Sequence, residues 1–273
     1  MPGKPGGGVA SAGAAWRGPQ YSGHPEHCQP NVHRKVYRLL DRLAAGWLPS
    51  RCLLCGGAGA VHAHDMCGAC EADLPWIEVA CPRCGLPLEA GATPVEDCGQ
   101  CRARPQPYRR CHAALHYAFP AGELVAALKY QGALAHARVL GTLLADSVAR
   151  HAVVGDVDVV VPLPLHTSRL MERGFNQSLE IARFTADRLD LVVDGRALRR
   201  LRVTTPQVGL TRAERAANVR KAFAADRSRV AGRHVALLDD VVTTGATSAA
   251  AADALLAAGA VTVDVWCVAR AAA

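Results

Sequence analysis

Residues 234–260 carry the pattern that most restricts what this chain can fold into. They read HVALLDDVVTTGATSAAAADALLAAGA: a short apolar run, two adjacent acids, a stretch of Thr and Gly, and an alanine-rich run. The apolar run predicts a buried strand over 234–238, and the alanine-rich run predicts a helix over 247–258. Because a strand that leads through a tight loop into a helix is half of a βαβ unit, this stretch favours an α/β fold.

Further apolar runs alternate with helical patterns on the amino-terminal side of this stretch, and one more run follows it. Short β-branched runs separated by helices are typical of a parallel sheet that is covered by helices on both faces. We therefore expect a large α/β domain of this kind. The predicted strands are 157–161 and 261–268, and the predicted helices are 122–130, 133–151 and 177–189.

The loop between the acids and the helix has the composition of an anion site. Backbone N–H groups and hydroxyls of such a loop can wrap a phosphate, a glycine permits close approach of the chain, and the helix adds the positive end of its dipole. The chain contains no G-x-x-x-x-G-K-[ST] segment, which excludes a Walker loop. The candidate phosphate-binding residues are Thr243, Thr244, Gly245, Ala246 and Thr247.

The two acids before this loop, Asp239 and Asp240, are candidates for ribose and metal binding. Ionised carboxylates accept hydrogen bonds from two vicinal hydroxyls, and they can also hold Mg²⁺ through water. Paired acids at a strand end are often simply solvated, which is the alternative interpretation. The combination of strand, acids, loop and helix favours the functional interpretation.

Eight of the eleven cysteines form four C-x-x-C pairs within about 50 residues. Two consecutive four-thiolate sites follow from this spacing, each closed around one tetrahedral Zn²⁺ and therefore structural rather than catalytic. An iron–sulfur cluster is the weaker alternative. Disulfides are disfavoured because the amino terminus lacks a secretory signal, so a cytoplasmic protein is expected. The predicted ligands are Cys52, Cys55, Cys67 and Cys70 for one site, and Cys81, Cys84, Cys98 and Cys101 for the other.

The composition along the chain predicts four regions. A Gly-, Pro- and Ala-rich stretch at 1–31 is expected to be disordered, and 32–48 shows the spacing of an amphipathic helix. Residues 49–106 hold the double zinc ribbon and 107–273 hold the α/β domain. The chain contains no apolar stretch long enough for a membrane span.

The net charge of +7 is concentrated in one part of the chain: residues 166–235 contain 15 Lys or Arg against 7 Asp or Glu. A basic segment beside an anion site can hold a polyanionic substrate or nucleic acid. Between Arg196 and Lys221 the segment is either a loop that closes over a pyrophosphate or an exposed basic helix around 211–221.

The run LLDDVVTTGAT resembles the phosphoribosyl-pyrophosphate signature of type I phosphoribosyltransferases. Together with the paired C-x-x-C module, LVAALKYQG, VPLPLHTSRLMERGFNQSLEIA and TPQVGLTRAERAANVRKAF, it resembles the ComF family of competence-associated proteins over almost all of residues 47–270. The resemblance implies a type I phosphoribosyltransferase fold at 107–273. It also implies binding of 5-phosphoribosyl 1-pyrophosphate with Mg²⁺, and a role in natural transformation with single-stranded DNA and DNA-uptake proteins as partners.

The resemblance also assigns residues to the site. The turn 161–164, with Pro162 and Leu163, would bind pyrophosphate, and Arg169 and Arg173 would act with the two acids as catalytic residues. Arginines offer planar forks of donors that suit pyrophosphate oxygens. Further substrate-binding residues by the same resemblance are Asn176, Gln177, Lys129 and Tyr130.

Thr243 leaves the acceptor of the phosphoribosyl group open. In the purine-salvage branch an acid at this position assists the base nitrogen, whereas a threonine is no general base at neutral pH. Three functions remain: a phosphoribosyltransferase with an unidentified acceptor, a non-catalytic phosphoribosyl or nucleotide sensor, and a nucleic-acid-binding module.

Overall fold

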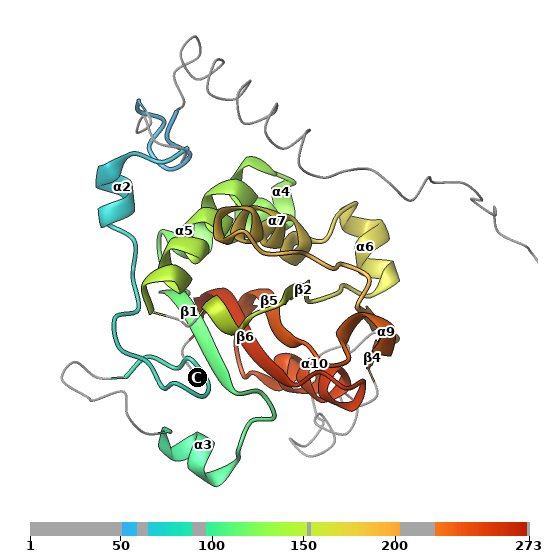
Figure 1. Cartoon of the computed structure of the whole chain (residues 1–273). Helices are drawn as coiled ribbons and strands as arrows, with labels where there is room; N and C mark the ends of the chain where they lie inside the picture. Colours follow the sequence, from blue (N-terminus) through green and yellow to red (C-terminus); the bar gives the residue numbers. More distant parts are fainter. Residues whose placement is uncertain (1–50, 59–64, 89–96, 152–153, 203–221, 272–273) are drawn as a thin grey trace, which may run out of the picture. The chain divides into compact units, whose positions relative to one another are not determined.

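A computed structural model describes residues 51–58, 65–88, 97–151, 154–202 and 222–271 (Figure 1). All of these residues belong to one unit that runs from Pro49 to Ala273. The predicted disordered stretch at 1–31 and the predicted helix at 32–48 lie outside the described residues, as do residues 203–221, which make up most of the predicted loop or helix between Arg196 and Lys221.

Four parallel strands form the central sheet, in the order β1-β6-β5-β2. The three strands expected from the sequence are present, and the fold class is the predicted one. β1 was not predicted, because its sequence RCHAALH mixes charged and apolar residues at the edge of the sheet. The strands are β1 (Arg110–His116), β2 (Val159–Pro162), β5 (His234–Val242) and β6 (Thr262–Arg270).

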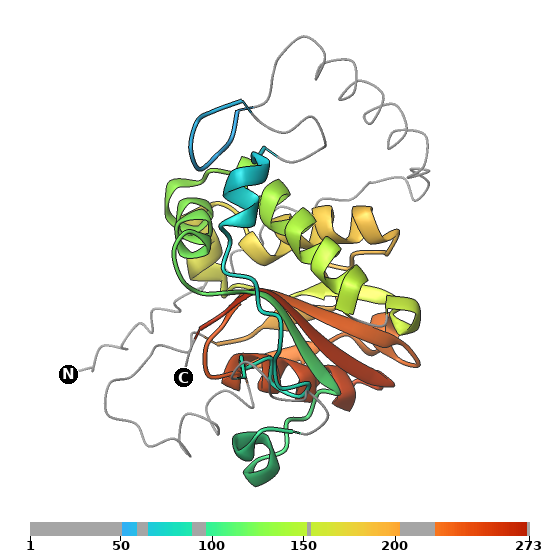
Figure 2. The same cartoon turned by 90° about the vertical axis from the view of Figure 1, so that its left-hand side faces the viewer.

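Helices cover both faces of this sheet, as Figures 1 and 2 show. α4 (Ala121–Gln131), α5 (Ala135–His151) and α7 (Gln177–Leu189) pack on one face, where Trp266 and Leu238 point. α10 (Ala246–Ala257) covers the other face, where Leu237 and Val265 point. Because successive strand residues point to opposite faces, the apolar residues of these strands supply two cores, one on each face.

Smaller elements complete the unit. A two-stranded antiparallel hairpin of β3 (Leu198–Arg200) and β4 (Phe223–Ala225) belongs to the α10 side of the core, as does Val230 at the end of α9 (Arg227–Val230). α6 (Thr167–Arg173) follows β2, and η1 (Val154–Asp156) precedes it. The cysteine segments contain α2 (Gly68–Ala72) and α3 (Gly99–Ala103). Throughout the described part of the chain, no helix combines the length and the apolar character that crossing a bilayer requires.

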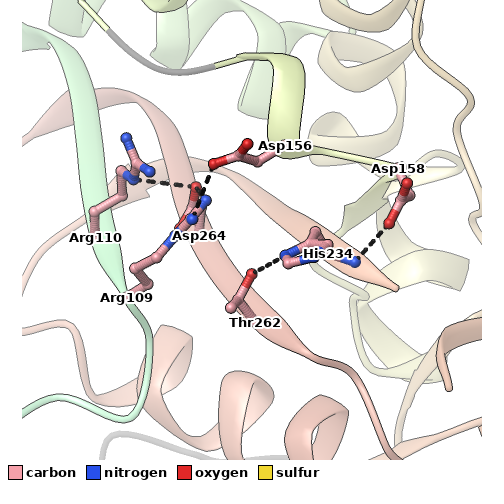
Figure 3. A network of polar contacts seen from close by, with 7 residues as sticks. All are labelled: Arg109, Arg110, Asp156, Asp158, His234, Thr262 and Asp264. Atoms are coloured by element: carbon pink, nitrogen blue, oxygen red, sulfur yellow. Dashed lines mark hydrogen bonds and ion pairs between the residues drawn. The ribbon is translucent and has the colours of Figure 1, made fainter. Parts of the chain in front are cut away.

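The amino ends of the strands are closed by ion pairs around Asp264, which is only 2% exposed (Figure 3). Arg109 donates from Nε and Nη2 to the two carboxylate oxygens at 2.9 and 2.8 Å, and Arg110 Nε lies 3.3 Å from Oδ2. Arg109 also pairs with Asp156 of η1 at 3.1 Å. A bidentate guanidinium on a buried carboxylate is a strong arrangement, so this edge is tied together by charge.

A second set of contacts at the same edge joins β2, β5 and β6 (Figure 3). The backbone N–H of His234 donates to Asp158 Oδ2 at 2.8 Å, and its ring Nδ1 lies 2.8 Å from Thr262 Oγ1. These bonds satisfy polar groups where the strands begin.

Candidate functional site

The paired acids lie inside β5 rather than after it, because β6 continues to pair with β5 as far as Val242. Asp239 and Asp240 are therefore buried, at 8% and 3% exposure. Ser178 Oγ donates to Asp239 Oδ1 at 3.2 Å, and the backbone N–H of Asp240 donates to the same oxygen at 2.8 Å. Lys129 Nζ lies 2.9 Å from Asp240 Oδ2. The two carboxylates are held in place by α4, α7 and their own strand.

The two acids share a crowded electrostatic environment. Burial, and after it the neighbouring Asp240 carboxylate, raises the pKa of Asp239 to about 8, while Lys129 acts in the opposite direction. Burial also lowers the pKa of Arg200, an effect that Asp239 counteracts and Arg169 reinforces. Carboxylates whose pKa values are shifted by burial and by like charge are typical of functional sites.

The predicted phosphate loop follows directly. Gly245 has φ +76°, a left-handed conformation that suits glycine, and it is the residue before the first turn of α10. The Ala246 N–H lies 3.4 Å from Thr244 Oγ1, and Ala249 N–H donates to the Gly245 carbonyl. Thr243, Thr244 and Ala246 are exposed. An open loop at a helix amino terminus has the donors that a monophosphate needs.

The predicted pyrophosphate turn leaves β2 beside these acids. The Leu163 N–H donates to the Leu238 carbonyl at 2.8 Å, which places the turn next to β5. Asn176 Nδ2 donates to the Leu163 carbonyl at 3.1 Å, and its Oδ1 accepts from Ser178 N–H and so caps α7. Asn176 thus holds the turn and starts the helix that carries Ser178.

The remaining predicted residues gather near α6 and the end of α4. The Arg173 guanidinium lies 5.8 Å from the centre of the Tyr130 ring and donates to Gln177 Oε1. Tyr130 is exposed and lies next in the chain to Lys129, which reaches Asp240. Arg169 is exposed on α6. The structure therefore brings Lys129 to the acids and Tyr130 to Arg173.

Two residues at the acids were not predicted as site residues. Ser178 bonds Asp239 from the first turn of α7, and Arg200 of β3 interacts electrostatically with Asp239. Ser178 had a signal in the sequence, since it follows the capping Asn176 at the start of a predicted helix. Arg200 lies in the basic part of the sequence, and nothing in its local sequence indicates its electrostatic interaction with Asp239.

The two cysteine clusters fit two zinc ions. In each cluster the four sulfurs lie within 4.8 Å of one another. Cys55 Sγ and Cys67 Sγ are 3.7 Å apart, and Cys84 Sγ and Cys98 Sγ are 3.8 Å apart. A tetrahedron with Zn–S bonds of about 2.3 Å has edges of roughly 3.8 Å. The predicted ligand sets are therefore brought together as two four-thiolate clusters.

The surroundings of the sulfurs explain why a cation belongs there. Burial raises the pKa of Cys52, but backbone N–H groups of Cys55, Cys67 and Leu54 outweigh it, and the result is a pKa of about 6. In the other cluster, burial and then the neighbouring Cys84 raise the pKa of Cys101. Four sulfurs this close cannot all be thiolates without a positive charge among them, and a divalent metal supplies it.

A parallel sheet with buried acids that lead into a Thr- and Gly-containing loop at a helix amino terminus, joined to two four-cysteine clusters, defines a type I phosphoribosyltransferase-like protein with an amino-terminal zinc module. The comparisons agree with this class. The family model for the double zinc ribbon domain matches residues 43–102. The chain is 35% identical over 226 residues to the DNA utilization protein YhgH of Salmonella typhimurium, which covers 82% of this chain and 98% of that protein.

A second relative is competence protein F of Haemophilus influenzae, which is 28% identical over 227 residues and covers 81% of this chain and 97% of that protein. The chain belongs to the ComF family, which includes these relatives. A solved glutamine phosphoribosylpyrophosphate amidotransferase from B. subtilis is 27% identical over 47% of this chain and 25% of its own length, with a TM-score of 0.33.

Proposed function

We propose that this protein binds 5-phosphoribosyl 1-pyrophosphate with Mg²⁺ and transfers its phosphoribosyl group to an acceptor. The observation that carries the proposal is the pair of buried carboxylates three and four residues before Thr243, with Lys129 2.9 Å from one and Ser178 3.2 Å from the other. The acids would accept from the two ribose hydroxyls, and the loop 243–247 would hold the 5-phosphate.

The pyrophosphate would lie against the turn 162–163 and the arginines near it. Arg200 interacts electrostatically with both Asp239 and Arg169, and Arg173 at the end of α6 lies by Tyr130, the neighbour of Lys129 in the chain. Mg²⁺, when bound, would neutralise pyrophosphate oxygens. In the transfer, the acceptor forms a bond to C1 of the ribose as the bond from C1 to pyrophosphate breaks, and the arginines stabilise the charge that gathers on the leaving group.

The acceptor and the cellular role form a finer part of the proposal. Relatives are named for DNA utilization and for competence, and the chain carries a net charge of +7. We therefore propose that the protein acts in the cytoplasm on incoming single-stranded DNA or on products derived from it. Polyanions are attracted to a basic segment beside an anion site.

A non-catalytic sensor of phosphoribosyl compounds is the second candidate. Thr243 is exposed and offers no carboxylate to an acceptor, and an Asp239 that is protonated near neutral pH is not ready to act as a base. Under this alternative the ligand binds in the same way, but no acceptor releases pyrophosphate.

Titration calorimetry with 5-phosphoribosyl 1-pyrophosphate and Mg²⁺ tests the proposal. Asp239→Ala combined with Asp240→Ala should weaken binding at least about tenfold, because a charge-assisted hydrogen bond contributes roughly 1.5 to 3 kcal/mol. Asp253→Ala on the exposed side of α10 is the matched control and should bind like the parent. A parent that does not bind, or a double variant that binds equally well, would refute the proposal; binding without pyrophosphate release would favour the sensor.

A further inference from the structure

Arg270, the last residue of β6, is a buried cation that joins two parts of the molecule. It is 5% exposed, and among the described residues its side chain donates to backbone carbonyls. Its Nη1 donates to the Val242 carbonyl at 3.1 Å and to the Thr243 carbonyl, at the point where β5 enters the phosphate loop. Its Nε donates to the Cys84 carbonyl at 3.0 Å. One guanidinium therefore connects the start of the phosphate loop to a metal ligand of the second cysteine cluster.

A second connection runs between the same two regions. Arg83, which lies between the ligands Cys81 and Cys84, donates from Nη1 to the Tyr108 carbonyl at 3.1 Å. Tyr108 is 1% exposed, and its hydroxyl lies 3.3 Å from the position that a Cβ on Gly245 would take. The side chain of Tyr108 thus lies against the glycine of the phosphate loop, while its backbone is bonded to the cluster.

The cluster itself is fastened to the sheet. The Cys111 N–H of β1 donates to the Pro82 carbonyl at 3.0 Å. Gly85 has φ +66°, and a Cβ there would lie 3.0 Å from Cys111 Sγ, so the turn that follows Cys84 lies tightly on β1. The Cys84 carbonyl therefore keeps a fixed position relative to β6 and Arg270 as long as this turn is folded.

The hydrogen bonds of Arg270 also influence the direction of the amides in the loop, together with the Ala271 N–H, which donates to the Val242 carbonyl at 3.0 Å. In a trans peptide the C=O of one residue and the N–H of the next point in opposite directions. When Arg270 draws the carbonyls of Val242 and Thr243 toward itself, the N–H groups of Thr243 and Thr244 must face away from it. These N–H groups belong to the loop 243–247, which the proposed function assigns to the 5-phosphate.

We infer that Arg270 is a positioning residue through which the second cysteine cluster, when it holds its metal, fixes the conformation of the phosphate loop. The inference rests on the proposed function only for the identity of the ligand. Loss of the metal would release the turn at Cys84, remove one carbonyl from a buried guanidinium and loosen its bonds to Val242 and Thr243.

The first cluster provides an internal contrast. Its described contacts run to the helical layer: Asp65, just before the ligand Cys67, forms an ion pair with Arg138 of α5. Met66 is fully buried in the core that α4, α5 and α7 share with the sheet. The first cluster thus anchors to helices, and its metal should not influence the loop.

Hydrogen exchange of backbone amides in the full-length protein tests the inference. Cys98→Ser and Cys67→Ser form a matched pair, since each residue is the third ligand of its cluster and precedes a five-residue helix. Arg270→Gln and Arg138→Gln form a second matched pair. Elemental analysis should show that either cysteine variant loses one of two zinc ions. Exchange across 240–250 should rise at least about fivefold in Cys98→Ser and Arg270→Gln and stay within about twofold in the other two.

The two arginine variants should also differ in their affinity for the ligand. Arg270→Gln should weaken binding of 5-phosphoribosyl 1-pyrophosphate about tenfold, and Arg138→Gln should leave it unchanged. Unchanged exchange across 240–250 in Arg270→Gln, or an equal rise in Arg138→Gln, would overturn the inference, and this result is available even if Cys98→Ser does not fold. If the parent does not bind the ligand, the proposed function fails, and the exchange comparison still decides the role of Arg270.

Discussion

Buried aspartates lie at both ends of the parallel strands, but their electrostatic surroundings are opposite. We call the end of the sheet where the strands begin the amino edge, and the end where they finish the carboxyl edge. At the amino edge, Asp264 receives two hydrogen bonds from Arg109 and a third charged contact from Arg110. At the carboxyl edge, Asp239 lies next to another carboxylate, and its pKa is raised to about 8 by burial and by Asp240. The amino edge is built for stability, whereas the carboxyl edge keeps a charge arrangement that folding alone does not favour.

This difference is informative because unfavourable polar arrangements persist in proteins mainly where a ligand compensates for them. A ribose that donates hydroxyl hydrogens, or a hydrated Mg²⁺, would stabilise the ionised form of Asp239. Asp264 already has its partners and has no need of a ligand. The predictions below use Asn substitutions at the two edges, which keep the shape of the side chain and remove its charge.

The largest effect is expected at the amino edge. Asp264→Asn removes the carboxylate that pairs with two arginines, and breaking a buried ion pair costs about 3 kcal/mol at the lower end of the usual range. The lower end applies because the side chains of Arg109 and Arg110 are partly exposed, at 31% and 26%. The melting temperature, followed by circular dichroism, should fall by roughly 6 °C or more. Asp253→Asn is the control, and a variant at Asp264 that melts with this control would contradict the assignment of a stabilising edge.

A smaller effect of opposite sign is expected at the carboxyl edge. Because the folded-state pKa of Asp239 is raised, the folded protein binds a proton that the unfolded chain has released, and stability is lost as the pH rises from about 4 to about 8. Asp239→Asn removes this loss. Its melting temperature should match the parent near pH 4 and exceed it at pH 8 by at least roughly 2 °C. A difference that does not grow with pH would show that Asp239 is already ionised in the folded protein.

The sequence predicted what is local and missed what is brought together over long distances. The strand, loop and helix around Gly245 and the C-x-x-C pairs are short patterns, and both are present as expected. β1 was missed because an edge strand needs little apolar sequence. Ser178 and Asp239 are hydrogen-bonded although 61 residues separate them in the sequence, and 186 residues separate Arg270 from Cys84. No spacing of residues in the sequence predicts such contacts.

The acids themselves illustrate the same limit. Their identity and their place between strand and loop followed from the sequence, which placed them directly after the strand, at its carboxyl end. In the structure β6 extends the pairing past them, so they are buried. Burial is the larger cause of the raised pKa of Asp239, and the adjacent Asp240 carboxylate of the DD motif adds to it.

The most direct test of the central claim compares ligand-induced stabilisation at the two edges. Melting temperatures of the parent, Asp264→Asn and Asp239→Asn would be measured at pH 8 with and without 5-phosphoribosyl 1-pyrophosphate and Mg²⁺. A ligand at about 100 times its Kd stabilises the folded state by about 2.7 kcal/mol. Asp264→Asn should melt lower than the parent and keep the ligand-induced rise, while Asp239→Asn should melt higher and lose about half of the rise or more. An equal rise in both variants, or a rise that Asp264→Asn alone loses, would contradict a ligand site at the carboxyl edge.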